Sequence, residues 1–241
     1  MPGASTLIST IRRDLQAAAD PFKAPGMRAY MKSEMPYLGV QTTPLRRICK
    51  AAFAAYPLHS FDSWTDTVLR LWREADHREE RYCAIELSGY KYYRDHQRLA
   101  ALPMYEEMIV TGAWWDYVDA IAGHRLRDIL LRSPKGMSRR MRAWSRDPDM
   151  WKRRSSIICQ LRRGLETDLD LLYECIESNV DDQQFFIRKA IGWALRNLAW
   201  FDLETVERYV ARNKSRLSGL SKREALKNAE KIRAACGGNA E

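Results

Sequence analysis

Apolar residues recur at helical spacing along most of the chain. Leu7, Ile11 and Leu15 mark one such face, and Trp64 and Val68 belong to another. Residues three or four apart lie on the same side of an α-helix, whereas a strand would alternate with a period of two. The sequence contains neither sustained β-branched alternation nor hairpin dipeptides. The pattern therefore predicts an all-α protein.

Prolines and glycines separate the amphipathic segments. Proline occurs repeatedly up to Pro148, and beyond it the breaks are glycines and polar runs such as residues 179–182. From these breaks we expect about twelve helices, each of roughly 10–18 residues and joined by short turns.

Two segments of the chain repeat one another at an offset of 34 residues. Residues 154–162 and 188–196 both begin with Arg, place Ile three positions later and end in Leu-Arg, and residues 81–87 are a looser relative. Helix-pair repeats stack into a curved solenoid whose concave side binds long ligands. Amphipathic helices also show such matches by coincidence, so the repeat alone does not decide between the two explanations.

Positive charge is concentrated in one part of the sequence. The 241 residues include 40 Lys and Arg against 31 Asp and Glu, a net charge of +9, and they suffice for one large domain or two small ones. Between Lys135 and Arg163 there are ten basic residues and only two acids, a net charge of +8. Such a stretch is typical of binding to a phosphate backbone, and the alternative is a solvated arginine face.

Cysteine and histidine usage argues against a metal cofactor. The five cysteines are isolated, at positions 49, 83, 159, 175 and 236, and the four histidines form no ligand pair. We therefore expect reduced thiols, no cofactor and a cytoplasmic protein. No apolar run approaches membrane-spanning length and the N-terminus lacks a signal-peptide pattern, so we expect no membrane partner.

The run Trp114-Trp115-Asp116-Tyr117-Val118-Asp119 is the most distinctive motif. On a helix, Trp115 and Asp119 lie one turn apart on the same face, whereas Asp116 projects about 100° from Trp115. A π surface beside a carboxylate suits an aromatic or cationic ligand. The alternative is that the tryptophans pack in the core and both acids are solvated.

Five blocks of sequence, in order, resemble the AlkD-like family of DNA alkylation repair glycosylases over roughly residues 5–235. The blocks are residues 30–42, 114–119, 151–154, 185–196 and 220–225. The resemblance implies a single domain over 1–241, a curved solenoid of HEAT-like helix pairs, with disordered ends at about 1–4 and 236–241. Two departures are local: Thr42-Thr43-Pro44 is one residue longer than the family's pattern, and Ser155-Ser156 replaces a small apolar pair.

The resemblance also implies an activity, the hydrolysis of the N-glycosidic bond of cationic N3- or N7-alkylated purines in duplex DNA. Asp119 matches the catalytic acid, and Trp115 and Trp193 match two aromatic groups that hold the sugar and the lesion. Arg154 matches a residue that anchors the DNA backbone. The other expected DNA-binding residues are Arg153, Lys152, Tyr30, Gln41, Arg188 and Lys189.

Alternatives remain for the individual residues and for the whole chain. Without the resemblance, Trp193 in its apolar helix is expected in the core, Asp116 competes with Asp119, and Arg154 could be a solvated residue. The chain could also be a non-catalytic module that binds bent or branched DNA, or a helical scaffold for other proteins.

The sequence has no helix-hairpin-helix signature, no catalytic lysine in a recognisable setting and no cysteine cluster for an iron–sulfur centre. We therefore expect a monofunctional, monomeric enzyme acting on alkylated duplex DNA at the nucleoid. The preferred lesion stays open, because the family implies a base held without a close-fitting pocket.

Overall fold

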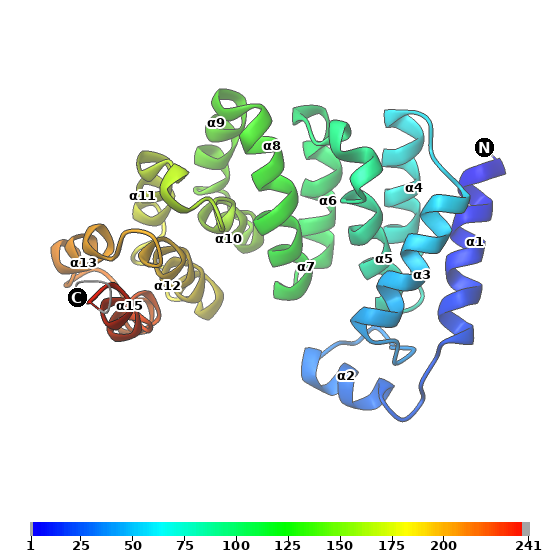
Figure 1. Ribbon diagram of the computed structural model, residues 1–241, viewed down its shortest axis with the longest axis horizontal. Helices are drawn as coiled ribbons and strands as arrows, with labels where there is room; N and C mark the ends of the chain where they lie inside the picture. The colour runs from blue at the N-terminus through cyan, green and yellow to red at the C-terminus, as the bar shows by residue number, and fades with distance from the viewer. Residues whose placement is uncertain (1, 238–241) are drawn as a thin grey trace. The chain divides into compact units, whose positions relative to one another are not determined.

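The computed structural model describes residues 2–237, which form helices and connecting turns without a strand among them (Figure 1). The predicted all-α class with HEAT-like helix pairs is confirmed. Contacts divide the chain into two compact units, Met1–Gln97 and Arg98–Glu241. Within the described residues, no helix has the length and apolar character that a membrane span needs.

The first unit is built around the helix pair α4 and α5. Its elements are α1 (Pro2–Ala17), α2 (Ala24–Met31), α3 (Thr42–Ala55), α4 (Phe61–Arg73), α5 (Arg78–Ser88) and the 3-10 helix η1 (Lys91–His96). Ser60 begins α4 because its side chain accepts from the Ser63 amide, a reciprocal capping box. The buried side of α4 carries Trp64 and Trp72, both shielded from solvent.

The second unit continues the chain of helices. Its elements are η2 (Leu99–Ala101), α6 (Leu102–Gly112), α7 (Trp115–Ala120), the π-helical turn η3 (Ile121–Leu126), α8 (Arg127–Arg132), α9 (Pro134–Trp144), α10 (Met150–Ile158), η4 (Gly164–Glu166), α11 (Leu169–Glu177), α12 (Phe185–Ala199), α13 (Leu203–Arg212), α14 (Gly219–Ala225) and α15 (Ala229–Gly237).

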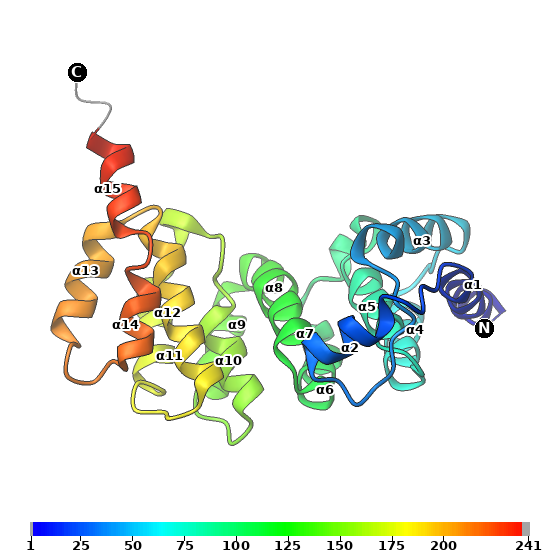
Figure 2. The same ribbon diagram turned by 90° about the horizontal axis from the view of Figure 1, so that it is seen from below.

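Helix α12 is the central element of this unit. It packs against α10 on one side and α14 on another, and α14 lies beside it in Figure 2. The close approach of α14 depends on Gly192, where an added Cβ would lie 2.4 Å from the Glu224 Cβ and 2.9 Å from the Ser221 carbonyl oxygen. The side of α12 with Ile191 and Leu195 is fully buried. The helix is therefore fixed on several sides, and its remaining face is free to carry functional residues.

The ends of the chain were expected to be disordered. Residues 2–4 instead begin α1, and Ala4 is buried. Residue 1 and residues 238–241 lie outside the described part of the chain.

A buried carboxylate fixes the turn that precedes α3. Glu79 is fully buried, and its two oxygens accept hydrogen bonds from the amides of Leu38, Gly39 and Val40 at 2.8–3.1 Å. Gly39 has φ +87°, and a Cβ at this position would lie 2.1 Å from the Asp20 carbonyl oxygen. The turn therefore requires glycine for both its conformation and its space.

Gly39→Ala should lower the free energy of unfolding by roughly 3 kcal/mol or more, because it combines left-handed strain with a backbone clash. Urea titration measures the change. Gly26→Ala is the matched control, since Gly26 lies in α2 with no atom within 4 Å of an added Cβ. The control should be neutral or slightly stabilising. Equal behaviour of the two variants would contradict the role assigned to this turn.

The additional residue near Thr43 is accommodated in the first turn of α3. Gln41 caps this helix, Thr42 begins it, and the Leu45 amide donates to the Gln41 carbonyl at 3.0 Å. Pro44 falls within this first turn, where a helix has no intrahelical acceptor for a backbone N–H.

Candidate active site

Asp119 and Arg154 form a bidentate ion pair inside the second unit. The Arg154 Nε donates to Asp119 Oδ1 at 2.7 Å, and a terminal nitrogen donates to Oδ2 at 2.8 Å. Helix α7 supplies the carboxylate and α10 the guanidinium. The Arg154 side chain is 5% exposed and that of Asp119 is 15% exposed. The parallel fork fixes the orientation of the carboxylate, which keeps a small opening to solvent.

Arg154 makes a third contact, with Phe186 of α12. Its other terminal nitrogen donates to the Phe186 carbonyl at 2.5 Å, and its Cζ lies 5.9 Å from the centre of the Phe186 ring. With three contacts and little exposure, the guanidinium is directed at Asp119 and α12 rather than at solvent. The guanidinium fixes the orientation of the Asp119 carboxylate, and contact of Arg154 with DNA stays a prediction.

Burial raises the pKa of Asp119 above its ordinary value, and the hydrogen bonds and charge of Arg154 act against that rise. The neighbouring charge of Asp116 adds a smaller upward effect. The site therefore holds a carboxylate that is poorly hydrated yet charge-paired. Such a group can accept a proton from water or stabilise a nearby positive charge.

The two tryptophans of the motif have different surroundings. Trp114 caps α7, and its ring contacts Trp151 and Phe186 with centroid separations of 6.3 and 5.6 Å. Trp115 begins α7, one turn before Asp119, and both are half-buried. The prediction that Trp115 and Asp119 share one helix is therefore confirmed, while Trp114 belongs to an aromatic cluster behind the ion pair.

Trp193 lies on the face of α12 that also carries Phe186. Its neighbours Ala190 and Ala194 are buried, but Trp193 itself is only half-buried. Seven residues separate it from Phe186, which corresponds to about two helical turns, or about 10 Å, along one face. The core position that the apolar sequence favours for Trp193 is therefore not the one it occupies.

Sequence reasoning missed a second polar contact, in which the turn after α10 contacts both α12 and η3. The Arg162 amide donates to the Asn197 side chain at 2.8 Å, and the Arg162 guanidinium lies 3.3 Å from the His124 Nε2. Arg162 has φ +68° in the turn after α10, Asn197 is one turn beyond Trp193, and His124 lies in η3. The only signal in the sequence was that Arg162 and Arg196 are equivalent in the 34-residue repeat.

Burial, with the charges of Arg162, Arg125 and Arg127, lowers the pKa of His124 to about 4. The imidazole is therefore neutral at physiological pH and can accept a hydrogen bond from Arg162. Along α12, Trp193 therefore lies between Phe186, whose carbonyl accepts from Arg154, and Asn197, whose side chain accepts from the Arg162 amide.

The two basic residues before Arg154 are engaged within the unit. Lys152 Nζ lies 2.6 Å from a Glu106 oxygen and 2.5 Å from an Asp147 oxygen. Arg153 pairs with Asp182 at 3.0 Å and also donates to two backbone carbonyls. Both side chains are less than 15% exposed. The sequence predicts that Lys152 and Arg153 contact DNA phosphates. A phosphate would have to compete with the acids and carbonyls that these side chains already bind.

Arg188 and Lys189 have partners too, although they are more accessible. Arg188 donates to the Asp182 carbonyl at 3.0 Å and to the Gln183 side chain, and Lys189 pairs with Glu224 at 2.8 Å. The Lys189 side chain is 37% exposed. Their contact with DNA stays a prediction.

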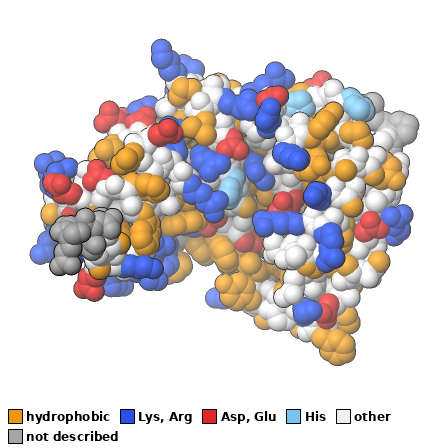
Figure 3. Space-filling model, in the orientation of Figure 1, with side chains coloured by type: hydrophobic (Ala, Val, Ile, Leu, Met, Phe, Trp, Pro, Cys, Tyr) orange, Lys and Arg blue, Asp and Glu red, His pale blue; other side chains and the backbone are white. Residues whose placement is uncertain are grey.

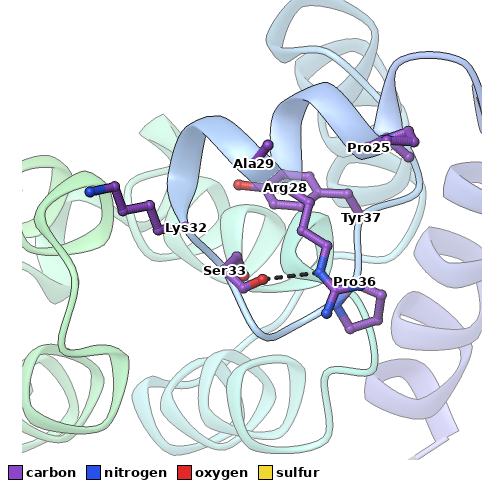
Figure 4. Close-up of a pocket in the computed structure, with 8 residues that line it drawn as sticks. Pro25, Arg28, Ala29, Lys32, Ser33, Pro36 and Tyr37 are labelled. Atoms are coloured by element: carbon purple, nitrogen blue, oxygen red, sulfur yellow. Dashed lines mark hydrogen bonds between the residues drawn. The ribbon is translucent and has the colours of Figure 1, made fainter.

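Tyr30 and Gln41 belong to the first unit, and Asp119 belongs to the second. Tyr30 is 74% exposed on α2, and Gln41 is the exposed residue that precedes α3. A cavity of about 480 Å³ lies on the same segment, lined among others by Pro25, Lys32 and Tyr37 (Figure 4). Roles for Tyr30 and Gln41 in the site stay predictions.

Within the described residues, no group of three or more His, Cys, Asp or Glu side chains is placed to hold a metal ion. The cysteines at 49, 83, 159 and 175 are buried. The side chain of Cys236 lies outside the described part of the structure.

The sequence of residues 11–229 matches the family model described as DNA alkylation repair enzyme. The chain belongs to this family. The resemblance found in the sequence blocks is confirmed, and the protein is an enzyme of DNA alkylation repair with DNA as its partner.

A solved structure supports the fold of this family member. A protein of Enterococcus faecalis described as a predicted DNA alkylation repair enzyme superposes with a TM-score of 0.78. The match covers 87% of this chain and 95% of that one, at 24% sequence identity. At this identity the likeness concerns the fold alone. Comparison with curated proteins found no significant match.

Proposed function

We propose that this DNA alkylation repair enzyme is a monofunctional glycosylase that hydrolyses the N-glycosidic bond of N3- or N7-alkylated purines in duplex DNA. The observation that supports the proposal is the buried Asp119–Arg154 pair. Half-buried Trp115 lies on the helix of Asp119, and half-buried Trp193 lies on α12, the helix whose Phe186 contacts Arg154. The proposal includes a monomer acting on nucleoid DNA in the cytoplasm, without a cofactor.

The chemistry requires little from a general acid. An N3- or N7-alkylated purine is cationic, so it leaves as a neutral base with the electron pair of the glycosidic bond. Positive charge then develops on the sugar, and water forms the new bond to C1′. A fixed carboxylate can stabilise that charge and accept the proton of the water.

Asp119 suits this task because Arg154 holds it in one orientation before the reaction begins. Interactions that are already in place at the transition state need no reorganisation. Arg154 is therefore a positioning residue, and Asp119 is the proposed catalytic residue.

The two tryptophans supply π surfaces for cationic groups. A cation over an indole face is stabilised by about 0.5–2 kcal/mol, and the largest values are found in desolvated sites. Both the alkylated base and the developing sugar cation are positively charged. We therefore assign Trp115 and Trp193 to the contact with the lesion and its sugar.

Trp115→Ala and Trp193→Ala should each reduce excision more than they reduce thermal stability, because both side chains are only half-buried. Excision rates and melting curves on the same preparations measure the two effects. Trp64→Ala is the structural control: Trp64 is fully buried in the first unit, and its loss should cost about 3–5 kcal/mol. A large stability loss with normal residual activity in the Trp115→Ala and Trp193→Ala variants would show that both tryptophans stabilise the fold and have no role in excision.

The direct test is to incubate the protein with methylated duplex DNA and separate the released bases by chromatography. Release of 7-methylguanine or 3-methyladenine supports the proposal. Tight binding of the duplex without release would instead identify a non-catalytic module that binds DNA by shape and charge.

A further inference from the structure

The basic stretch of the sequence does not form one surface. Its later part, on α10, is buried or paired with acids, as described for residues 152–154. Its earlier part lies on α9, and four residues there define the α9 basic face: Lys135, Arg139, Arg140 and Arg142. Helix α9 contains no acidic residue.

This face points away from the helices that α9 packs against. The buried side of α9 carries Met137, Met141 and Trp144, and it contacts α8, α10 and α11. At 100° per residue, Lys135, Arg139 and Arg142 lie about 140–200° round the helix from Met137, and exposed Arg140 projects from the flank between this face and the buried side. The α9 basic face is therefore separate from the side of α10 that carries Arg154.

Three of the four cations on this face lack the acidic partners that many other arginines of the chain have. Arg142 pairs with Glu174 at 2.6 Å. Lys135, Arg139 and Arg140 are exposed, and none has an ion pair or side-chain hydrogen bond within residues 2–237. Like charges four residues apart on a helix, such as Lys135 and Arg139, repel one another. An unpaired cluster of this kind is favourable when an anionic partner covers it.

We propose that the α9 basic face binds the phosphate backbone of a second segment of duplex DNA, in addition to the segment held at the Asp119 site. From Lys135 to Arg142 the face extends about 10 Å along the helix. One strand of B-DNA carries a phosphate every 3.4 Å of axis, so about three phosphates face this length. Lys135 and Arg139 can each contact one of these phosphates, and the long side chain of Arg140 can reach another from the flank of the face.

DNA fits this face better than an acidic protein does. Protein interfaces depend on buried aromatic or large apolar anchors, and α9 has no exposed large apolar side chain. Lys and Arg side chains project at the edge of the surface where α9 lies (Figure 3). A face of cations without an apolar anchor is typical of sequence-independent contact with phosphates.

The test is a bridging assay with two undamaged duplexes, one immobilised and one labelled in solution. The wild-type protein should retain the labelled duplex. The triple variant Lys135→Gln, Arg139→Gln and Arg140→Gln should lose about tenfold or more of this retention, with a salt slope lower by about two to three units. Its melting temperature and its excision rate on a short duplex should stay unchanged, since surface substitutions are nearly neutral.

A control variant removes three positive charges from α13 and the turn that follows it: Arg208→Gln, Arg212→Gln and Lys214→Gln. It should bridge nearly as well as the wild type. Absence of bridging by the wild type, full bridging by the triple variant, or equal loss in the control would each overturn the inference. Bridging needs no base release, so Asp119→Asn should bridge normally even if the proposed activity fails.

Discussion

Asp119→Asn should lower the single-turnover rate of base release by on the order of 10²–10³-fold while the duplex stays bound. The substitution keeps the shape of the side chain and removes the charge that faces the developing sugar cation. Because the stabilised charge exists mainly in the transition state, affinity for undamaged or lesion-containing DNA should change little. Quenched reactions with excess protein, and binding isotherms with the same duplex, measure the two quantities.

Asp116→Asn is the matched control, since Asp116 is in the same motif and is also half-buried. It should retain most of the excision rate, because Arg154 is paired with Asp119 and not with Asp116. A near-normal rate in Asp119→Asn together with a large loss in Asp116→Asn would transfer the catalytic role to Asp116.

Arg154→Met should lower the free energy of unfolding by about 3–5 kcal/mol at pH 7, because it leaves a buried carboxylate without its cation. Without Arg154, burial acts unopposed and raises the folded-state pKa of Asp119 further. The folded state then binds a proton more tightly than the unfolded state. The loss is therefore largest above the raised pKa and shrinks as pH falls through it.

Denaturant titrations at pH 7 and pH 5 measure this dependence. The double variant Asp119→Leu with Arg154→Met should recover most of the stability, since an apolar pair of similar volume can replace a buried ion pair. It should remain unable to release bases. A cost below about 1 kcal/mol for the single variant at pH 7 would show that the pair is solvated rather than buried.

The sequence predicts contacts best when both partners are on one helix. Trp115 and Asp119 are one turn apart, so helical spacing alone placed them on one face. The pairing of Asp119 with Arg154 joins residues 35 positions apart, and no periodicity contains that information. The family resemblance named both residues without their pairing, and its assignment of Arg154 to the DNA backbone stays a prediction.

Charge along the sequence was a poor guide to charge on the surface. Ten basic residues between 135 and 163 suggested one phosphate-binding surface. Helices α9 and α10 pack against each other, and acids distant in sequence pair with the α10 residues Lys152 and Arg153. Asp182 and Glu106, which neutralise Arg153 and Lys152, lie outside the stretch.

Helix boundaries were predicted less well than helix existence. About twelve helices were expected, and the structure has shorter ones, labelled α1 to α15. One cause is η3, a π-helical turn that joins α7 to α8 without a proline to mark it. A π-helical turn holds more residues than an α-helical turn. The side chains after Asp119, including that of His124, therefore project in directions that α-helical spacing does not predict.

The fate of a labelled methyl group tests the proposed activity most directly. Duplex DNA carrying isotopically labelled methyl groups at N7 of guanine and N3 of adenine is incubated with the wild-type protein. The label should appear in free 7-methylguanine and 3-methyladenine, with one abasic site for each released base and no strand break. Label that leaves the DNA without its base, moves to the protein, or stays on DNA that the protein binds would contradict glycosidic hydrolysis.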